Sequence, residues 1–386
     1  MPDPNPGEER LEQYWRSPAQ GPRILFFSGG SALRGVARAL KRYTWNSVHI
    51  VTPFDSGGSS AEIRRAFGML SVGDLRNRLL ALADEGPGAD PALFQLMSFR
   101  LPGEAEPAEL RARLSAMVDG GDPLIDPIAE PARTVVRELL GSCAEAMPDD
   151  FDLRHASVGN LVLAGGYLRE HRDMATVLQT LSDFVGVRGV VRPVTEDDLQ
   201  LGATLVDGTA CIGQHNLTGK EVEPIASPIE ELFLTRGGQR TESAASPDVL
   251  ERIARAELIV YPMGSFFSSV LCNLLPAGVG RAIVESDAPK IYLPNAGRDP
   301  EQLGMFVEDG VQRIVDAVRA DAGDDVPTRQ IVSTLVCDRR DDLYGGVPNV
   351  FRLALEGIEV VRMQLSEDEQ SLYDPERVVK MLLSFA

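Results

Sequence analysis

The stretch Thr52-Pro-Phe-Asp55-Ser-Gly-Gly-Ser-Ser60 places an acidic residue in a bend of small residues, directly after the apolar run Val48–Val51. A short helix-like link leads to a second such bend, Ser71-Val-Gly73-Asp74, which precedes a helical pattern. Small residues let backbone N–H groups approach an anion, a helix start adds the positive end of a dipole, and a carboxylate can hold Mg²⁺. This stretch therefore predicts a phosphate and metal site in an α/β protein.

A strand, a glycine turn and a helix precede this stretch. The apolar run Arg23-Ile-Leu-Phe-Phe27 has the composition of a buried parallel strand and ends at Ser28-Gly29-Gly30-Ser31. Apolar residues with helical period follow over residues 33–40, and the next strand is expected at 48–51. This βαβ start predicts ligand binding at the carboxyl ends of the strands.

The remaining pattern predicts one α/β domain over residues 21–386, after a flexible N-terminal tail over residues 1–20. We expect a helical insertion at about 86–150, although a helical layer of the same domain explains this segment equally well. A helix is expected from about 155 to 184, and strands with hairpin signals over 187–240 favour an antiparallel excursion. Helices are then predicted at 247–256, 278–286, 305–320 and 375–384, and strands at 257–261, 290–293, 330–336 and 359–362.

Composition narrows the class of protein. The net charge of −19 argues against a nucleic-acid partner, because a phosphate backbone needs a basic surface. Four widely spaced cysteines without a CxxC pair fit free thiols in a reducing compartment. We expect a cytoplasmic protein, because the first twenty residues lack the apolar core of a signal peptide and no apolar run reaches the ~20 residues of a membrane span.

Each candidate site residue also has a plainer interpretation. The turn Gly29-Gly30-Ser31 matches neither GxGxxG nor the Walker pattern, so it is weak evidence by itself and argues against a dehydrogenase or a P-loop ATPase. Asp55 is favoured as a ligand or metal residue over a turn residue, because it follows the second strand. Asp74 is either a helix N-cap or a functional carboxylate, and the neighbouring Arg76 and Asn77 favour function.

Two further segments carry polar groups at predicted helix starts. Asn160 opens an apolar helix, where a helix cap and a ligand contact are equally good interpretations. Gly264-Ser265 and Ser268-Ser269 form a donor-rich turn after another apolar strand, and an ordinary helix cap by Ser265 is the alternative. The turn at Gly264-Ser265 would lie at the same edge of the sheet.

Taken in order, these motifs resemble the 2-phospho-L-lactate transferase (CofD) family and its nucleotide-sugar-binding bacterial relatives. The matching residues span roughly 23–305 and are Gly29-Gly30, Asp55-Ser-Gly-Gly-Ser59-Ser60, Gly73-Asp74-Leu-Arg76-Asn77, Val158-Gly-Asn160-Leu, Gly213-Gln-His-Asn216, Gly264-Ser265-Phe-Phe-Ser268-Ser269 and Lys290-Ile-Tyr-Leu-Pro-Asn295. Each motif is weak alone, but their common order is specific.

The resemblance implies a Rossmann-like three-layer α/β fold with a mostly parallel sheet, a homodimer, and Mg²⁺ as cofactor. It implies that Asp55 and Asp74 are catalytic, with Asp55 also the metal ligand. It assigns the nucleotide-containing ligand to a set of turn residues: Gly29, Gly30, Ser31, Ser59, Arg76, Asn77, Asn160, Gly264 and Ser265. No nucleic acid or membrane partner is implied.

The chain departs from the family pattern within these turns. Ser56 stands where the family commonly has a second Asp, and Tyr261-Pro-Met-Gly264 stands where Gly-Pro-Gly is usual. These changes indicate a divergent subgroup with a changed ligand. We therefore expect a Mg²⁺-dependent transferase of a phosphoryl-linked group from a nucleotide-activated donor to a small acceptor, or alternatively a non-catalytic protein that binds a nucleotide sugar or dinucleotide and regulates a partner.

Overall fold

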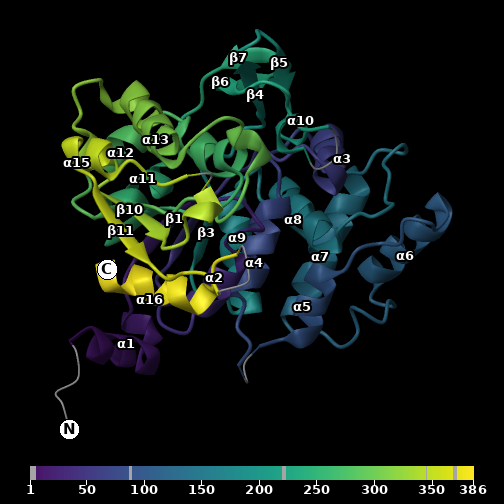
Figure 1. The fold of residues 1–386 in the computed structure, drawn as a ribbon. Coiled ribbons are helices and arrows are strands. Elements are labelled where there is room, and N and C mark those ends of the chain that lie inside the picture. Colours follow the sequence, from purple (N-terminus) through teal and green to yellow (C-terminus); the bar gives the residue numbers. More distant parts are fainter. Residues whose placement is uncertain (1–5, 87–88, 220–222, 345, 368–371) are drawn as a thin grey trace. The chain divides into compact units, whose positions relative to one another are not determined.

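The computed structural model describes residues 6–86, 89–219, 223–344, 346–367 and 372–386, and the chain divides into two compact units (Figure 1). The first unit comprises residues 1–52, 188–195 and 200–386, and the second comprises residues 53–187 and 196–199. Within the described residues no helix is both long and apolar enough to cross a bilayer.

The first unit is built on a parallel sheet with the strand order β11-β10-β9-β8-β1-β2-β3. Its strands are β1 (Ile24–Ser28), β2 (Val48–Val51), β3 (Val190–Pro193), β8 (Leu258–Tyr261), β9 (Lys290–Tyr292), β10 (Thr334–Asp338) and β11 (Glu359–Met363). Central strands such as β1 and β8 are buried at every position, because helices cover both faces of the sheet. The predicted α/β, mostly parallel architecture is confirmed.

The helices of the first unit form two layers around this sheet (Figure 1). On one face α2 (Arg34–Leu40) and α16 (Pro375–Phe385) pack their apolar side chains against Ile24 and Phe26 of β1. The opposite layer contains α11 (Pro247–Ala254), α12 (Val279–Glu285) and α13 (Val307–Ala322). The other helical elements of this unit include α1 (Pro6–Arg16), α10 (His215–Thr218), α14 (Thr328–Ile331), α15 (Val350–Leu355), η2 (Phe266–Val270), η3 (Leu271–Leu274) and η4 (Pro300–Gln302).

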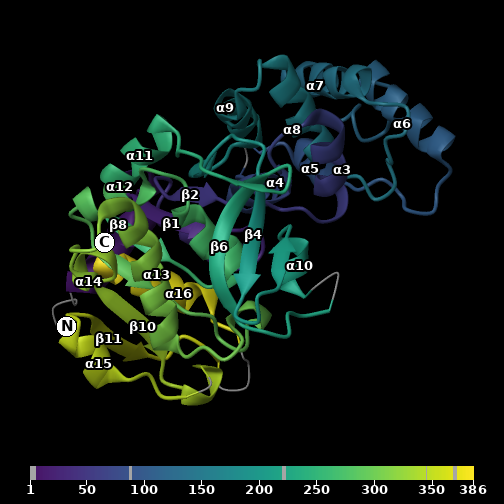
Figure 2. The same ribbon diagram turned by 90° about the horizontal axis from the view of Figure 1, so that it is seen from above.

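A small antiparallel sheet belongs to the same unit (Figure 2). Its order is β5-β4-β6-β7, from β4 (Gln200–Leu205), β5 (Ala210–Ile212), β6 (Ile229–Arg236) and β7 (Gln239–Thr241). It is the predicted antiparallel excursion.

The second unit is helical. It contains α3 (Gly58–Phe67), α4 (Gly73–Leu82), α5 (Pro91–Ser98), α6 (Pro107–Asp119), α7 (Ala132–Ala146), α8 (Val158–Arg169) and α9 (Met174–Val185). The segment at about 86–150, for which helices were predicted, contains α5, α6 and α7. Helix α8 is buried from Val158 to Tyr167, which explains why its sequence is almost entirely apolar.

Four details differ from the sequence-based expectations. The helix expected over 155–184 is two helices, because His171 and Arg172 adopt positive φ and Asp173 caps a new helix. Residues 189–192 were assigned to the antiparallel excursion, but β3 pairs with β2 in the parallel sheet. The strand expected at 330–336 begins only at Thr334, after α14. The N-terminal segment expected to be a tail contains α1, whose Leu11 and Tyr14 pack on the core of the first unit.

Candidate functional site

Three predicted polar segments of the second unit meet around Gly73, at the start of α4. A Cβ atom built on Gly73 would lie 2.7 Å from Ser60 Oγ, 3.5 Å from Asp55 Oδ2 and 3.8 Å from Asn160 Nδ2. Glycine at this position therefore leaves room for side chains from a loop and two helices to converge. We call these residues, Asp55, Ser60, Gly73 and Asn160, the Asp55 cluster.

The loop that carries Asp55 is held by its own backbone and by Arg64. The Gly57 N–H donates to Asp55 Oδ1 at 3.1 Å, and the Arg64 guanidinium donates to the Asp55 carbonyl at 3.2 Å. Arg64 is itself buried and is fixed by Asp198 at 2.9 Å. Asp55 Oδ1 thus stabilises the turn through its hydrogen bond, while Oδ2 faces Gly73.

Asn160 is not the cap of α8, so the cap interpretation is wrong, and the predicted ligand contact of Asn160 stays a prediction. Ser157 is the cap, and its hydroxyl accepts from the Asn160 N–H. The Asn160 side chain instead donates from Nδ2 to Ser59 Oγ at 3.2 Å. Its Oδ1 is buried and has no hydrogen-bond partner among the described residues. A buried acceptor without a partner costs free energy, so this oxygen is available to a ligand, a metal ion or water.

Arg76 and Asn77 form a second polar group one helical turn further along α4. The buried Arg76 guanidinium donates to Ser157 Oγ and, at 2.7 Å, to Asn77 Oδ1. Gly159 permits this approach, because a Cβ there would lie 2.8 Å from Arg76 Cδ and 2.4 Å from the Met97 carbonyl. Arg76 therefore joins α4 to the start of α8, in addition to the ligand role predicted for it.

Asp74 lies in the first turn of α4, but Val72 occupies the N-cap position, so the cap interpretation of Asp74 is wrong. Arg78, four residues further along α4, has a fully buried side chain. Burial lowers the pKa of Arg78 to about 10, and the negative charge of Asp74 opposes this shift. The charge of Asp74 thus favours the charged form of the buried Arg78. The catalytic role of Asp74 stays a prediction.

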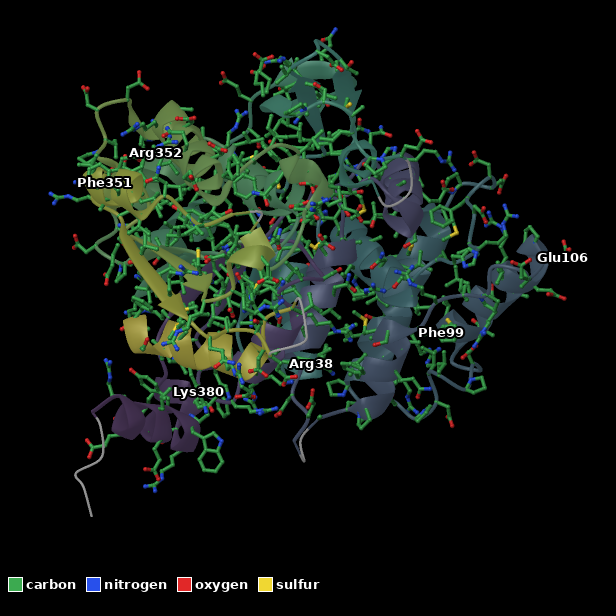
Figure 3. All side chains as sticks on the ribbon, in the orientation of Figure 1. Arg38, Phe99, Glu106, Phe351, Arg352 and Lys380 are labelled. Atoms are coloured by element: carbon green, nitrogen blue, oxygen red, sulfur yellow. The ribbon has the colours of Figure 1, made fainter. Side chains whose placement is uncertain are left out.

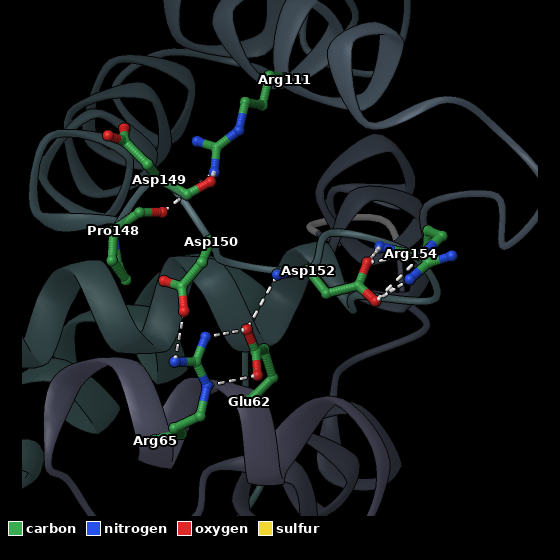
Figure 4. A network of polar contacts seen from close by, with 8 residues as sticks. All are labelled: Glu62, Arg65, Arg111, Pro148, Asp149, Asp150, Asp152 and Arg154. Atoms are coloured by element: carbon green, nitrogen blue, oxygen red, sulfur yellow. Dashed lines mark hydrogen bonds and ion pairs between the residues drawn. The ribbon is translucent and has the colours of Figure 1, made fainter.

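An exposed ion-pair network holds α3 to the loop that precedes α8 (Figure 4). Arg65 pairs with Glu62 at 2.7 Å and with Asp150 at 3.0 Å, and the Asp152 N–H donates to Glu62 Oε1 at 2.9 Å. The hydrogen bond from Arg65 is the main reason that the pKa of Glu62 is lowered. Since α3 carries Ser59 and Ser60 and the loop leads to Asn160, this network helps to fix the relative positions of the cluster residues.

The first unit contains the predicted turns after β1 and β8, which are neighbouring strands. A Cβ on Gly264 would lie 3.8 Å from Ala32 Cβ, so the two turns are close together. Gly30 is buried, Gly29 and Ser265 are half-buried, and Ser31 is exposed. The structure thus brings Gly29–Ser31 and Gly264–Ser265 together in one unit, as predicted.

In the turn after β8 (residues 264–268, called the β8 turn), most backbone N–H groups donate hydrogen bonds to carboxylates of the same unit. Sequence analysis missed these carboxylates. Asp299 Oδ2 accepts from the Phe266 N–H at 2.7 Å, and Glu301 Oε2 accepts from the N–H groups of Phe267 and Ser268 at 2.9 Å each. The Gly264 N–H donates to Asn295 Oδ1 at 2.8 Å. Only the Asn295 motif was noted in the sequence, because Asp299 and Glu301 belong to the single short turn η4, of which Asp299 is the N-cap, and such a turn has no clear sequence pattern.

The buried state of Glu301 perturbs its protonation. Burial, with a further contribution from the charge of Asp299, raises the pKa of Glu301 to about 7. The Ser268 hydroxyl lies against its other oxygen, Oε1. Glu301 is therefore a buried carboxyl group that organises the β8 turn and titrates near neutral pH.

The oxygen atoms of the Asp55 cluster suit Mg²⁺. No group of three or more His, Cys, Asp or Glu side chains with metal-binding geometry exists among the described residues. Mg²⁺ is commonly held by one or two carboxylates together with substrate phosphates and water. Asp55 Oδ2 faces Gly73, and Asn160, whose Nδ2 is the atom nearest Gly73, adds a buried amide oxygen with no partner among the described residues; these two side chains supply oxygen atoms of that kind.

The sheet topology, the glycine turns and the helical unit define a Rossmann-like α/β protein. The sequence profile of the 2-phospho-L-lactate transferase CofD family matches residues 24–347, and the chain belongs to this family.

Curated proteins similar to this chain are described as gluconeogenesis factors and not as transferases. A putative gluconeogenesis factor from Clostridium acetobutylicum is 28% identical over 298 residues, which are 76% of this chain and 53% of that protein. One from Nostoc is 30% identical, over 76% of this chain and 52% of that protein. The chain thus spans about half the length of these relatives. The gluconeogenesis factor of Bacillus subtilis is 24% identical over 94% of this chain and 98% of that protein.

A solved structure has the same fold. The crystal structure of a Bacillus halodurans protein described as a UPF0052 family member superposes with a TM-score of 0.68 and 25% identity, over 94% of this chain and 99% of the other.

Replacing Gly73 by alanine is expected to weaken Mg²⁺-dependent nucleotide binding by about 10-fold or more, because the new methyl group would displace Ser60 and crowd Asp55. Isothermal titration with nucleoside diphosphates and Mg²⁺ measures this effect. Gly141→Ala is the matched control: its Cβ would make only an ordinary 3.5 Å contact with Val118, and alanine favours the helical state. Equal binding by both variants would remove the Asp55 cluster from ligand recognition.

Proposed function

We propose that this protein is a Mg²⁺-dependent transferase of a phosphoryl-linked group, from a nucleotide-activated donor to a small acceptor. The observation that carries this proposal is the Asp55 cluster, where a carboxylate oxygen of Asp55 and the amide nitrogen of Asn160 lie around a glycine, and the amide oxygen of Asn160 is buried without a partner among the described residues. Membership of the CofD family supports the class of reaction.

The transfer requires an acceptor hydroxyl oxygen to form a bond to the donor phosphorus, while the bond from that phosphorus to the nucleotide oxygen breaks. The nucleoside monophosphate leaves, and the hydroxyl proton passes to a base or to water. Such reactions depend mainly on positioning and on neutralisation of the phosphate charge. When bound, Mg²⁺ supplies that neutralisation, and Asp55 with Asn160 would hold it.

The chain's own residues have separate tasks in this proposal. Asp55 presents one oxygen, while its other oxygen stays bound to the Gly57 N–H and keeps the loop in place. Asn160 and Ser59 orient one another through their hydrogen bond. In the first unit, the half-buried Ser265 occupies the N-cap position of η2, but its hydroxyl does not cap that helix. It is a candidate contact for the nucleotide.

The test is an assay of nucleoside monophosphate release from nucleoside-diphosphate-linked donors, with mixtures of hydroxyl acceptors, in the presence and absence of Mg²⁺. Release that requires both an acceptor and Mg²⁺ supports the proposal. A homodimer, expected from the family, is tested in the same preparation by analytical ultracentrifugation.

A regulatory function without catalysis is the second candidate. Two observations favour it: Ser56 replaces the second carboxylate that the family resemblance leads one to expect, and the curated relatives are described as gluconeogenesis factors. Tight binding of a nucleotide sugar or dinucleotide, without release of product under any acceptor condition, would support this function instead.

A further inference from the structure

An apolar groove with an acidic rim lies in the first unit, between β6, η3 and α13, and has no part in the proposed transfer. Its volume is about 560 Å³. The floor is apolar and includes Leu271, Leu274 and Leu275 from η3 and the residue after it, with Ala317 and Ala320 from α13. We call it the β6–α13 groove.

The rim of this groove is strongly acidic. Five carboxylates line it, from Glu230, Glu231, Glu242, Asp316 and Asp321, and Arg313 is its one basic residue. The Arg313 guanidinium is already engaged, because it donates to the carbonyls of Ile229 at 2.8 Å and Glu230 at 2.7 Å. Glu231 is paired with Arg240 and Asp321 with Arg281, whereas Glu230 and Glu242 are exposed and neither forms an ion pair within the described part of the chain. The rim therefore favours a cationic occupant and repels nucleic acid and anionic membranes.

One flank of β6 also lacks a neighbouring strand. Strand β7 pairs only with Leu234–Arg236, so Ile229–Phe233 have β4 on one side and, among the described residues, no strand on the other. The unpaired part of β6 lines the groove. An exposed strand edge of this kind can accept an added strand from another polypeptide.

We propose that the β6–α13 groove binds an extended segment of a partner protein in which lysine or arginine alternates with apolar residues. The segment adds a strand beside Glu231–Phe233, because the carbonyls of Ile229 and Glu230 already accept hydrogen bonds from Arg313. Side chains on one face of the strand pack on the leucine and alanine floor, and the basic side chains on the other face meet the carboxylates of the rim. This binding needs no nucleotide, so it stands independently of the proposed transferase activity.

The probe is a fluorescein-labelled Lys-Val-Lys-Leu-Lys-Val-Lys-Gly peptide, with a control peptide in which glutamate replaces each lysine. Fluorescence anisotropy with the full chain is expected to show saturable binding of the basic peptide only. The Glu230→Lys/Glu242→Lys variant should bind it at least 10-fold more weakly, and Ala317→Trp, which fills the floor, should also weaken binding.

The matched control is Glu106→Lys/Glu109→Lys on α6 of the second unit, which changes the net charge of the chain by the same amount at exposed sites; Glu106 is labelled in Figure 3. It should bind the basic peptide like the unmodified protein. Hydrogen exchange of the amides of Glu231–Phe233 should slow when the peptide is bound. Equal weakening by both double variants, protection confined to other segments, or no saturable binding would overturn the proposal.

Discussion

Replacing Asp55 by asparagine is expected to lower Mg²⁺-dependent transfer by at least about 100-fold, because the cluster loses its one carboxylate. Asparagine has nearly the same volume, and its side-chain oxygen can still accept from the Gly57 N–H. The loop should therefore keep its conformation while the charge is lost. Release of nucleoside monophosphate, measured over a range of Mg²⁺ concentrations, gives the size of the loss.

The control for this substitution is Asp150→Asn, which removes an exposed carboxylate of the same unit from the network in Figure 4. An exposed ion pair contributes at most about 1 kcal/mol to folding, so this variant should retain its activity. Thermal unfolding of both variants shows whether the fold is intact. Turnover by Asp55→Asn equal to that of the unmodified protein would refute the role assigned to Asp55. Loss of nucleotide binding without any turnover in the unmodified protein would favour the regulatory function.

Replacing Glu301 by alanine is expected to destabilise the first unit by about 3–5 kcal/mol, because it leaves the buried N–H groups of Phe267 and Ser268 without an acceptor. Glutamine should behave very differently. Its amide oxygen can accept from both N–H groups, and its NH₂ group can donate to the Ser268 hydroxyl, as a protonated carboxyl group would. Urea unfolding of the three proteins measures these differences.

The stability of the glutamine variant relative to the unmodified protein should depend on pH. Burial raises the pKa of Glu301 in the folded state to about 7, whereas an unfolded glutamate titrates at about 4.3. The folded state thus binds more protons between these values, and the stability that the protonated group contributes is lost as pH rises through about 7. At pH 8 Glu301→Gln should be more stable than the unmodified protein by on the order of 2 kcal/mol, since one pKa unit corresponds to about 1.4 kcal/mol. At pH 5 the two should differ much less. A difference independent of pH would contradict this account of Glu301.

Backbone N–H groups of the β8 turn already donate hydrogen bonds within the protein, and this changes how a ligand can bind there. The turn was interpreted as donor-rich, but the N–H groups of Gly264, Phe266, Phe267 and Ser268 are bound to internal oxygen atoms. A phosphate group would have to compete with Asp299 and Glu301 for these donors. We therefore expect Ser265 to contribute more to nucleotide binding than Gly264, whose backbone adopts a positive φ that L side chains rarely adopt.

Local sequence patterns were sufficient for most of the fold. Continuous apolar runs with glycine turns indicate buried parallel strands and their carboxyl ends, and the strand expected at 48–51 is β2. The same patterns selected Asp55, Ser59 and Asn160, because small and polar residues next to apolar runs mark loops that face a ligand. Whether a glycine is needed for a turn or for close packing is not a local property. Only the structure shows that Gly73 leaves room for Ser60 and Asp55.

The sequence by itself determined the class of fold, the family and the polar residues at the ends of the strands, since these depend on periodicity and on short motifs. The tertiary structure decided which of those polar groups already have hydrogen-bond partners within the protein. Asn160 keeps an unpartnered oxygen, Arg78 is buried, and Glu301 occupies donors more than thirty residues away in the chain. Hydrogen-bond partners and burial are set by contacts between distant segments, and no local pattern encodes them.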